Sequence, residues 1–307
     1  MHPHPRIAAI DLGSNSFHML IAKATTRGYR IITRHRQKVR LADGLTPDLT
    51  LDDAAIERGI ECLKDFAQRL AHYQPLQIRC VATATLRKAH NRKQILKRFE
   101  RALGSPIDII SGMTEAGLIY QGATLELARP DSAMLVLDIG GASTEVIAGV
   151  GTEPHVLKSL DMGCVVWQNR FFADGMISAA RFAAAVAAAA EQIRPLATTY
   201  QAHGWQTVCG ASGTFRGLQD CLRHYRADAL SAEFIRFCME ESIKQGSVDA
   251  LPAIGVREDR IAVFCGGLAI LVALTENLGI QTVDLAQGAL REGLVNTMLN
   301  ERKRSLA

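Results

Sequence analysis

The chain has 307 residues, of which 48% are hydrophobic, 21% charged and 6% aromatic. This composition excludes a disordered protein and a small disulfide-stabilised domain, and the length accommodates two compact domains of about 150 residues each. The longest uncharged apolar stretch, 261–274, is shorter than the roughly 20 residues of a membrane span, and no signal peptide is predicted because Asp11 follows only four apolar residues.

The net charge of +4 is unevenly distributed along the chain. Residues 1–118 carry 19 Lys and Arg against 11 Asp and Glu, whereas residues 119–307 carry 16 against 20. A basic half joined to an acidic half indicates a polyanionic ligand near the first and a cation near the second. Uneven drift of surface charge is the alternative interpretation.

The cysteines and histidines show none of the spacings that are typical of metal sites. The seven cysteines are odd in number and form no C-x-x-C pair, and the nine histidines form no H-E-x-x-H. We therefore expect reduced, mostly buried thiols in a cytoplasmic protein, with neither disulfides nor a transition-metal site.

The first half of the chain alternates strands and helices. Strands are predicted over 6–11, 16–24 and 29–35, followed by a helix that Thr50 opens and whose apolar residues recur at the helical period. The remaining predicted elements are a strand over 78–83, a helix over 91–103, a strand over 107–111 and a helix from 114 to about 128. The resulting order is β-β-β-α-β-α-β-α.

The second half repeats this order. Its predicted strands cover 133–138, 144–150, 156–160, 207–209 and 282–286, and its helices cover 179–190, 214–222, 232–244, 257–278 and 288–300. The sequence Asp11-Leu-Gly-Ser-Asn-Ser is matched 127 residues later by Asp138-Ile-Gly-Gly-Ala-Ser. The repeat predicts two α/β lobes around a central cleft, an N-terminal lobe over 1–120 and a C-terminal lobe over 121–307.

The repeated motif has the composition of a phosphate-binding turn. Glycines and serines let the backbone approach a ligand closely, and successive N–H groups of such a turn point at anionic oxygens. The aspartates that end the two strands, Asp11 and Asp138, repel phosphate unless a cation intervenes, so their predicted role is to hold Mg²⁺ directly or through water. Plain tight turns with aspartate as turn former are the alternative, and the duplication favours the phosphate site.

A second carboxylate follows the second turn. Glu145 lies on the same side of its strand as Ser143 and suits a cation shared with Asp138. A solvated strand residue is the alternative.

A third glycine turn, Gly210-Ala-Ser-Gly-Thr, lies between a short strand and a helix. The N–H groups at this helix N-terminus would bind an anion through Gly210, Ser212 and Gly213. A simple turn with Thr214 as N-cap is the equal alternative.

Two charged residues of the first half lie at strand ends. Glu115 follows the strand that ends at Ser111 and falls in the first turn of a helix, where an open α/β sheet presents groups to its cleft. Compensation of the helix dipole is the alternative role. Arg87 follows another strand at the same edge, where a guanidinium would clamp a phosphate.

Four cations alternate along one extended segment: Arg34, Arg36, Lys38 and Arg40. A solvated edge strand guarded against aggregation is one interpretation of this pattern. If the strand faces a cleft, its cations would attract a polyphosphate.

Seven collinear motifs resemble those of the exopolyphosphatase/guanosine pentaphosphate phosphohydrolase family (Ppx/GppA). They cover residues 8–19 (AAIDLGSNSFHM), 81–87 (VATATLR), 110–116 (ISGMTEA), 137–145 (LDIGGASTE), 162–165 (MGCV), 210–214 (GASGT) and 288–294 (GALREGL). The form of the second motif and Ala142 are most similar to the guanosine pentaphosphatase branch.

The resemblance implies two RNase H-like lobes of the actin, sugar-kinase and heat-shock ATPase superfamily. It also implies a hydrolase that removes terminal phosphate from the stringent-response nucleotide pppGpp, giving ppGpp, or from inorganic polyphosphate. Mg²⁺ is the implied cofactor, and the implied partners are these phosphate-rich small molecules, with no nucleic acid or membrane and a homodimer left open. A polyphosphate-preferring enzyme and a non-catalytic (p)ppGpp sensor are the alternatives.

The family's functional residues carry over by position. Glu115 matches the catalytic carboxylate that orients or deprotonates the attacking water. Asp138 and Glu145 match acidic residues of the Mg²⁺/phosphate site, with Asp11 as their partner on the first lobe. The phosphate-binding positions are matched by Ser14, Asn15, Ser16, Arg87, Gly140, Gly141, Ala142, Ser143 and Thr144.

The sequence departs from the family pattern in two places. Thr114 stands where the family usually has a first glutamate, and Glu115 retains the second, catalytic one. Long members continue beyond the position of Ala307 into a helical HD-like region, so the expected form is a short one without that C-terminal helical domain. Processive action on long chains is not implied.

Overall fold

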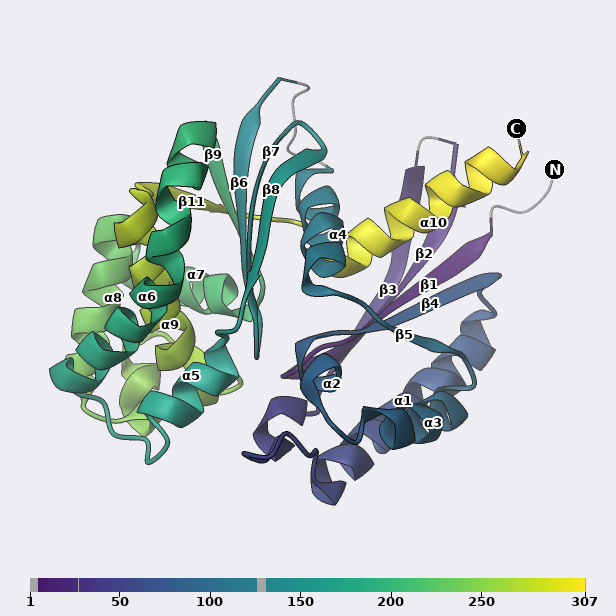
Figure 1. Cartoon of the computed structure of the whole chain (residues 1–307), viewed down its shortest axis with the longest axis horizontal. Coiled ribbons are helices and arrows are strands. Elements are labelled where there is room, and N and C mark those ends of the chain that lie inside the picture. Colours follow the sequence, from purple (N-terminus) through teal and green to yellow (C-terminus); the bar gives the residue numbers. More distant parts are fainter. Residues whose placement is uncertain (1–4, 27, 126–130, 307) are drawn as a thin grey trace. The chain divides into compact units, whose positions relative to one another are not determined.

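The computed structural model describes residues 5–26, 28–125 and 131–306 (Figure 1). The chain divides into two compact units, the first formed by Met1–Gly122 with Gly288–Ala307 and the second by Ala123–Gln287. Each unit contains one mixed β-sheet with helices packed on it, which confirms the predicted α/β fold with an internal repeat.

The sheet of the first unit has the strand order β3-β2-β1-β4-β5. Its strands are β1 (Arg6–Leu12), β2 (Ser16–Thr25), β3 (Gly28–Lys38), β4 (Gln77–Ala82) and β5 (Ile107–Ile109). The three-stranded meander β1-β2-β3 is antiparallel, whereas β4 and β5 join it in parallel. This order is the RNase H-like topology that was expected.

Helices cover the apolar face of this sheet. Alternate residues of β1 and β2 face a core formed with α1 (Asp53–Tyr73) and α3 (Arg92–Leu103). The N-cap of α1 is Asp52, whose side chain accepts a hydrogen bond from Ala55 N at 2.6 Å, so Thr50 does not cap the helix as predicted. The unit also contains the 3₁₀ turn η1 (Leu41–Gly44), α2 (Ala84–Lys88), α4 (Gly112–Thr124) and α10 (Leu290–Leu306).

The predicted helix from 114 to about 128 corresponds to α4, which begins two residues earlier. Its expected end at 126–128 lies outside the described residues. The early start has a local cause, because Ser111 Oγ accepts a hydrogen bond from Thr114 N at 3.0 Å and so satisfies one donor of the first helical turn.

The last helix belongs to a different unit from the one predicted. Residues 288–307 were assigned to the C-terminal lobe over 121–307, but α10, yellow in Figure 1, packs against β1 and β2 of the first unit. Glycines allow this docking: a Cβ on Gly122 of α4 would lie 1.9 Å from the Ala289 carbonyl oxygen, and one on Gly293 would lie 2.0 Å from that of Leu118. The backbones of α4 and α10 therefore approach more closely than any side chain permits.

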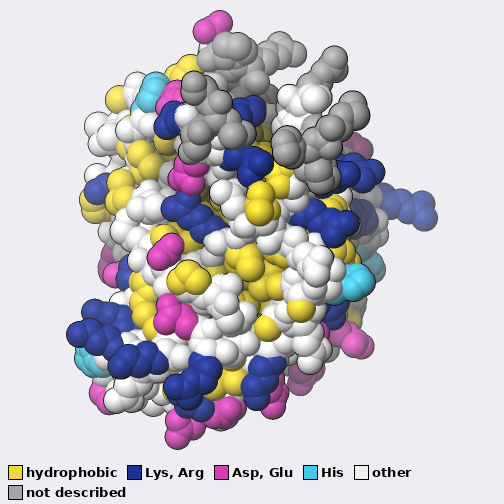
Figure 2. Space-filling view, turned by 90° about the vertical axis from the view of Figure 1, so that its right-hand side faces the viewer, with side chains coloured by type: hydrophobic (Ala, Val, Ile, Leu, Met, Phe, Trp, Pro, Cys, Tyr) yellow, Lys and Arg dark blue, Asp and Glu magenta, His cyan; other side chains and the backbone are white. Residues whose placement is uncertain are grey.

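The difference in net charge between the two units is larger than that between the two halves of the sequence, because α10 belongs to the first unit. The first unit now holds 23 Lys and Arg against 13 Asp and Glu, and the second holds 12 against 18. Figure 2 shows that, on the face it presents, Lys and Arg side chains stand in groups between apolar and acidic ones. The positive charge on that face is therefore distributed in local groups of side chains.

Placing a methyl group at Gly122 tests the docking of α10. We expect Gly122→Ala to lower the free energy of unfolding by about 1–3 kcal/mol, because the new Cβ overpacks a backbone contact. Chemical denaturation measures the change. Gly213→Ala is the matched control, since a Cβ there meets nothing within 4 Å. Equal stability of Gly122→Ala and wild type would contradict the close contact.

The second unit repeats the topology and adds one strand. Its sheet has the order β10-β11-β9-β6-β7-β8, with β6-β7-β8 antiparallel and β6-β9-β11 parallel. The strands are β6 (Ala133–Ile139), β7 (Thr144–Val150), β8 (Glu153–Leu160), β9 (Thr207–Ala211), β10 (Leu230–Ser231) and β11 (Thr282–Leu285). The hairpins β1-β2 and β6-β7 thus occupy equivalent places.

The helices of the second unit include one that the sequence did not predict. They are α5 (Cys164–Phe171), α6 (Ala179–His203), α7 (Gly213–Tyr225), α8 (Ala232–Gln245), the 3₁₀ turn η2 (Val248–Ile254) and α9 (Ile261–Leu278). α5 was missed, and α6 continues well past the Ala-rich run. α9 is long and apolar enough to cross a membrane by composition, and 72% of it is buried inside the unit, as in a central core helix.

The cysteines are structural. All seven are free thiols and all are buried, as predicted. Burial raises the pKa of Cys62, Cys164 and Cys209 to about 12, so these thiols are protonated and unreactive at neutral pH.

Candidate active site

Glu115 and Arg87 meet in the first unit. Glu115 is 6% exposed in the first turn of α4, and Arg87 Nη1 donates to its Oε2 at 3.1 Å. The same Arg87 nitrogen donates to the Ile110 carbonyl oxygen at 2.9 Å. Arg87 follows β4, as predicted, and lies in the short helix α2, which was not predicted.

This contact gives Arg87 a protein partner besides the phosphate predicted for it. The residue was predicted as a phosphate clamp, and in the structure its guanidinium holds the carboxylate of Glu115 in place from a side chain that is 26% exposed. A guanidinium has five N–H donors, so a ligand contact through the remaining donors is compatible with this pairing.

The turn between β1 and β2 presents its N–H groups and hides its carbonyl groups. The carbonyl oxygens of Ser14 and Asn15 accept hydrogen bonds from Ala42 N and Arg40 N, both at 2.9 Å. The N–H groups of Ser14 and Asn15 donate to no acceptor in the part of the chain that the structure describes. Ser14 and Ser16 are both buried.

The turn between β6 and β7 is built in the same way. The carbonyl oxygens of Gly140 and Gly141 accept from Cys164 N at 2.8 Å and from Val165 N at 3.0 Å. These donors belong to the beginning of α5, whose motif 162–165 therefore supports the turn. Sequence reasoning noted this motif without a role for it.

Close packing between the β6-β7 turn and the beginning of α5 explains why residue 163 is a glycine. A Cβ on Gly163 would lie 2.4 Å from Ala142 N, so only glycine fits. Among the described residues, the N–H groups of Gly141, Ala142 and Ser143 have no protein acceptor. Both turns thus have the features of anion-binding nests, with N–H groups available and carbonyl groups engaged behind them.

The side chain of Thr144, a residue predicted to belong to the phosphate turn, bonds within the protein. Its Oγ1 donates to the Met162 carbonyl oxygen at 2.7 Å and is fully buried. The hydroxyl therefore joins the turn to the segment before α5.

Two buried carboxylates lie opposite one another in the second unit. Asp138 and Glu145 are direct register partners of β6 and β7 and are 9% and 1% exposed. Direct partners have Cβ atoms about 4.5–5.5 Å apart on one face of the sheet. Ser159 Oγ donates to Glu145 Oε1 at 2.7 Å, which fixes that carboxylate.

The donor set of this pair fits Mg²⁺. Two like charges buried side by side repel one another unless a cation or a proton compensates them. Within residues 5–26, 28–125 and 131–306, no group of three or more His, Cys, Asp and Glu side chains is placed to hold a metal. Oxygen ligands in small number suit Mg²⁺, which keeps several waters and takes substrate phosphates as further ligands.

Asp11 has different surroundings in the first unit. Its Oδ1 is buried without a hydrogen-bond partner in the described part of the chain. Its register partner is His18, whose Nδ1 lies 3.1 Å from Arg291 Nη1. Burial raises the pKa of Asp11 to about 6, Arg291 opposes the rise and Glu292 adds to it. Sequence reasoning missed Arg291 and Glu292, although the motif at 288–294 was the signal.

Removing the charge of Asp11 is expected to stabilise the protein at neutral pH. The folded-state pKa of about 6 lies above the value of 3.8 for an unperturbed carboxyl, so the unfolded state binds fewer protons between these pH values and stability falls as the pH rises through them. Asp11→Asn should therefore raise the free energy of unfolding by about 1–3 kcal/mol above pH 6 and leave it nearly unchanged at pH 4.

Thermal melts in the presence of a chelator, at pH 4 and pH 7.5, measure this difference. Asp53→Asn serves as the control, because Asp53 is an exposed carboxylate on α1 of the same unit. An equal shift at both pH values, or none at pH 7.5, would contradict the burial cost assigned to Asp11.

The residues of the third glycine turn, 210–213, differ in their surroundings. Gly210 lies under an aromatic ring, since a Cβ there would be 2.1 Å from Phe215 Cδ1, so its role is packing. Ser212 has a φ of 90°, and its buried Oγ has no partner among the described residues. α7 begins at Gly213, so Thr214 is not the N-cap. Ser212 and Gly213 remain candidates for anion binding.

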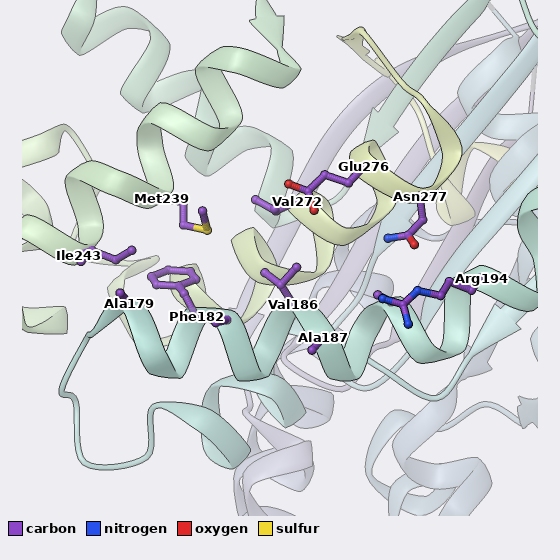
Figure 3. A pocket seen from close by; sticks show the side chains of 12 residues that line it. Ala179, Phe182, Val186, Ala187, Arg194, Met239, Ile243, Val272, Glu276 and Asn277 are labelled. Carbon is purple, nitrogen blue, oxygen red and sulfur yellow. The ribbon is translucent and has the colours of Figure 1, made fainter.

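A cavity of about 470 Å³ in the second unit does not coincide with any predicted site residue. It lies between α6, α8 and α9, where small alanines of α6 face Met239 and Ile243 of α8 and Val272 of α9 (Figure 3). Arg194, Glu276 and Asn277 are its polar residues. The apolar lining lacks the row of donors that a phosphate site requires.

Comparison with known proteins gives a consistent assignment. Residues 20–302 match the model of the Ppx/GppA phosphatase family. The chain is 45% identical over 300 residues to a guanosine-5'-triphosphate,3'-diphosphate pyrophosphatase of Aeromonas hydrophila, covering 97% of this chain and 60% of that protein. The chain therefore spans about three fifths of the length of the curated relative it matches.

Solved structures show the same fold. A crystal structure of an exopolyphosphatase-like protein is 26% identical with a TM-score of 0.86, and the superposition covers 99% of both chains. An exopolyphosphatase from Cytophaga hutchinsonii is 23% identical with a TM-score of 0.88, covering 96% of this chain and 98% of that one. The family match, which extends over most of the sequence, shows that the chain belongs to the Ppx/GppA phosphatase family.

Proposed function

We propose that the chain is a Mg²⁺-dependent phosphoanhydride hydrolase. Its substrates are pppGpp, from which it releases the terminal phosphate to give ppGpp, and inorganic polyphosphate. The name of the Aeromonas relative supports a guanosine pentaphosphate substrate, and the names of the structural neighbours support polyphosphate.

Glu115 carries the proposal. A carboxylate that is 6% exposed at a helix N-terminus and held by a guanidinium is costly for stability and suited to chemistry. As general base, Glu115 accepts the proton of a water molecule while that water attacks the terminal phosphorus. The bond to the bridging oxygen breaks, and the electron pair leaves with the shortened phosphate chain. Arg87 is a positioning residue for the Glu115 carboxylate.

The two hairpin turns bind phosphate oxygens through backbone N–H groups. Positioning and charge neutralisation dominate phosphoryl transfer, which leaves one carboxylate to align the nucleophile. Asp138 and Glu145 would hold Mg²⁺ through their carboxylate oxygens. When bound, the ion supplies charge neutralisation for the phosphate oxygens.

A substrate panel tests the proposal. The purified chain is incubated with Mg²⁺ and with pppGpp, ppGpp, ATP, tripolyphosphate or long-chain polyphosphate, and initial rates of phosphate release are compared. We expect release from pppGpp and polyphosphate. Faster release from polyphosphate would favour the alternative of a polyphosphate-preferring enzyme. Binding of pppGpp without any release, measured by calorimetry, would refute hydrolysis and indicate a sensor.

A further inference from the structure

Three side chains lie in a row across the meander of the first unit. Asp11 on β1 is the register partner of His18 on β2, and His18 is the partner of Arg36 on β3. Direct cross-strand partners share one face of a sheet, so all three stand on the same face. α10 packs on this face and brings Arg291 to His18.

The equivalent row of the second unit contains no basic residue. It consists of Asp138 on β6, Glu145 on β7 and Ser159 on β8, joined by the same register relations. Two carboxylates and a hydroxyl favour a cation. In the first unit a histidine and an arginine take the places of Glu145 and Ser159, so the row there has two basic side chains beside its one carboxylate.

More cations continue the row along β3. Lys38 is the register partner of Ser16, the last residue of the first phosphate turn, and Arg36 Nε lies 3.5 Å from Ser16 Oγ. Arg34 follows on the same face, because alternate residues of a strand share a face and recur about every 6.7 Å. The cations therefore begin at the turn and extend away from it along the strand.

One of these cations, Arg34, forms an ion pair with a residue of α10. Arg34 Nη2 donates to Oε1 of Glu292, whose side chain is 6% exposed, at 3.3 Å. Glu292 Oε2 also accepts from Ala289 N at 3.0 Å, so the carboxylate is fixed by α10. A solvated edge strand that only prevents aggregation needs no such buried partner.

We propose that Arg34, Arg36, Lys38 and Arg291, the basic row, form a second anion subsite. It binds the phosphates of a linear phosphate chain that lie beyond the one being cleaved. The inference rests on the proposed function for the first phosphate turn. Cations repeated along an extended strand match a linear polyanion, whereas a single compact phosphate would contact one of them.

Binding without turnover tests this subsite. In the Glu115→Gln background with a chelator present, calorimetry measures the affinities for inorganic phosphate and for long-chain polyphosphate. Arg36→Gln/Lys38→Gln removes two cations of the row. Lys23→Gln/Arg30→Gln removes two cations that are register partners at the other end of the same hairpin and is the matched control.

We expect the first double variant to weaken binding of long-chain polyphosphate about tenfold or more, since each charge-assisted contact contributes on that scale. Its affinity for inorganic phosphate, the control variant and Arg36→Lys should all stay near the starting values. Unchanged polyphosphate affinity in Arg36→Gln/Lys38→Gln overturns the proposal. An equal loss in the control, or an equal loss for inorganic phosphate, overturns it as well.

The test separates this inference from the proposed function. If the chain binds polyphosphate through the basic row but wild type releases no phosphate, the hydrolase proposal fails and the subsite stands. If wild type releases phosphate and the basic row does not contribute to binding, the subsite proposal fails and the hydrolase proposal stands.

Discussion

Glu115→Gln is expected to lower the rate of phosphate release by about 10²–10⁴-fold, the range that a general base contributes. Glutamine keeps the size of the side chain and can still receive a hydrogen bond from Arg87, so the structure around α4 is preserved. It cannot accept a proton from water. The loss should therefore appear in kcat, with KM little changed, because the phosphate turns remain intact.

Initial-rate measurements on pppGpp and on polyphosphate check this expectation, and circular dichroism checks the fold. Glu61→Gln is the matched control, an exposed glutamate on α1 of the same unit. Wild-type kcat in Glu115→Gln would remove the proposed base. A collapse of both kcat and thermal stability would point instead to a structural role for the Arg87–Glu115 pair.

Asp138→Asn should affect activity and stability in opposite directions. Loss of one carboxylate of the pair weakens Mg²⁺ binding, so we expect activity to fall by about 10²-fold or more at low Mg²⁺, the scale of one lost electrostatic contact in an active site. Added Mg²⁺ should restore part of the rate. Without metal, removal of the repulsion from Glu145 should stabilise the fold by about 1 kcal/mol.

A Mg²⁺ titration of the initial rate and thermal melts in chelator measure these two effects. Asp284→Asn on β11 is the control, because it removes an exposed carboxylate from the same sheet. Activity of Asp138→Asn equal to wild type at every Mg²⁺ concentration would contradict the cation site. A lower melting temperature in chelator would contradict the like-charge repulsion.

Local sequence patterns predicted most of the sheet. The strands around Asp11 and Asp138 are short apolar runs bounded by glycine turns, and both appear within a residue of their expected places. Strand alternation predicted the side of the strand on which Glu145 lies, and the structure makes Glu145 the register partner of Asp138.

Contacts between segments that are distant in the sequence were not predicted. α10 joins the first unit because glycines at 122 and 293 permit backbone contact, and no periodicity reveals which sheet a terminal helix covers. The pairing of Arg87 with Glu115 depends on α2 and α4 meeting, and the contact of Arg291 with His18 depends on α10. The helix α5 was missed because it is short and directly follows a glycine turn.

Turnover of pppGpp in ¹⁸O-labelled water tests the central claim most directly. If a water molecule aligned by Glu115 attacks the terminal phosphorus, mass spectrometry of the products will find the label in inorganic phosphate and not in ppGpp. Label in the nucleotide, or no release of phosphate in the presence of Mg²⁺, would contradict the account.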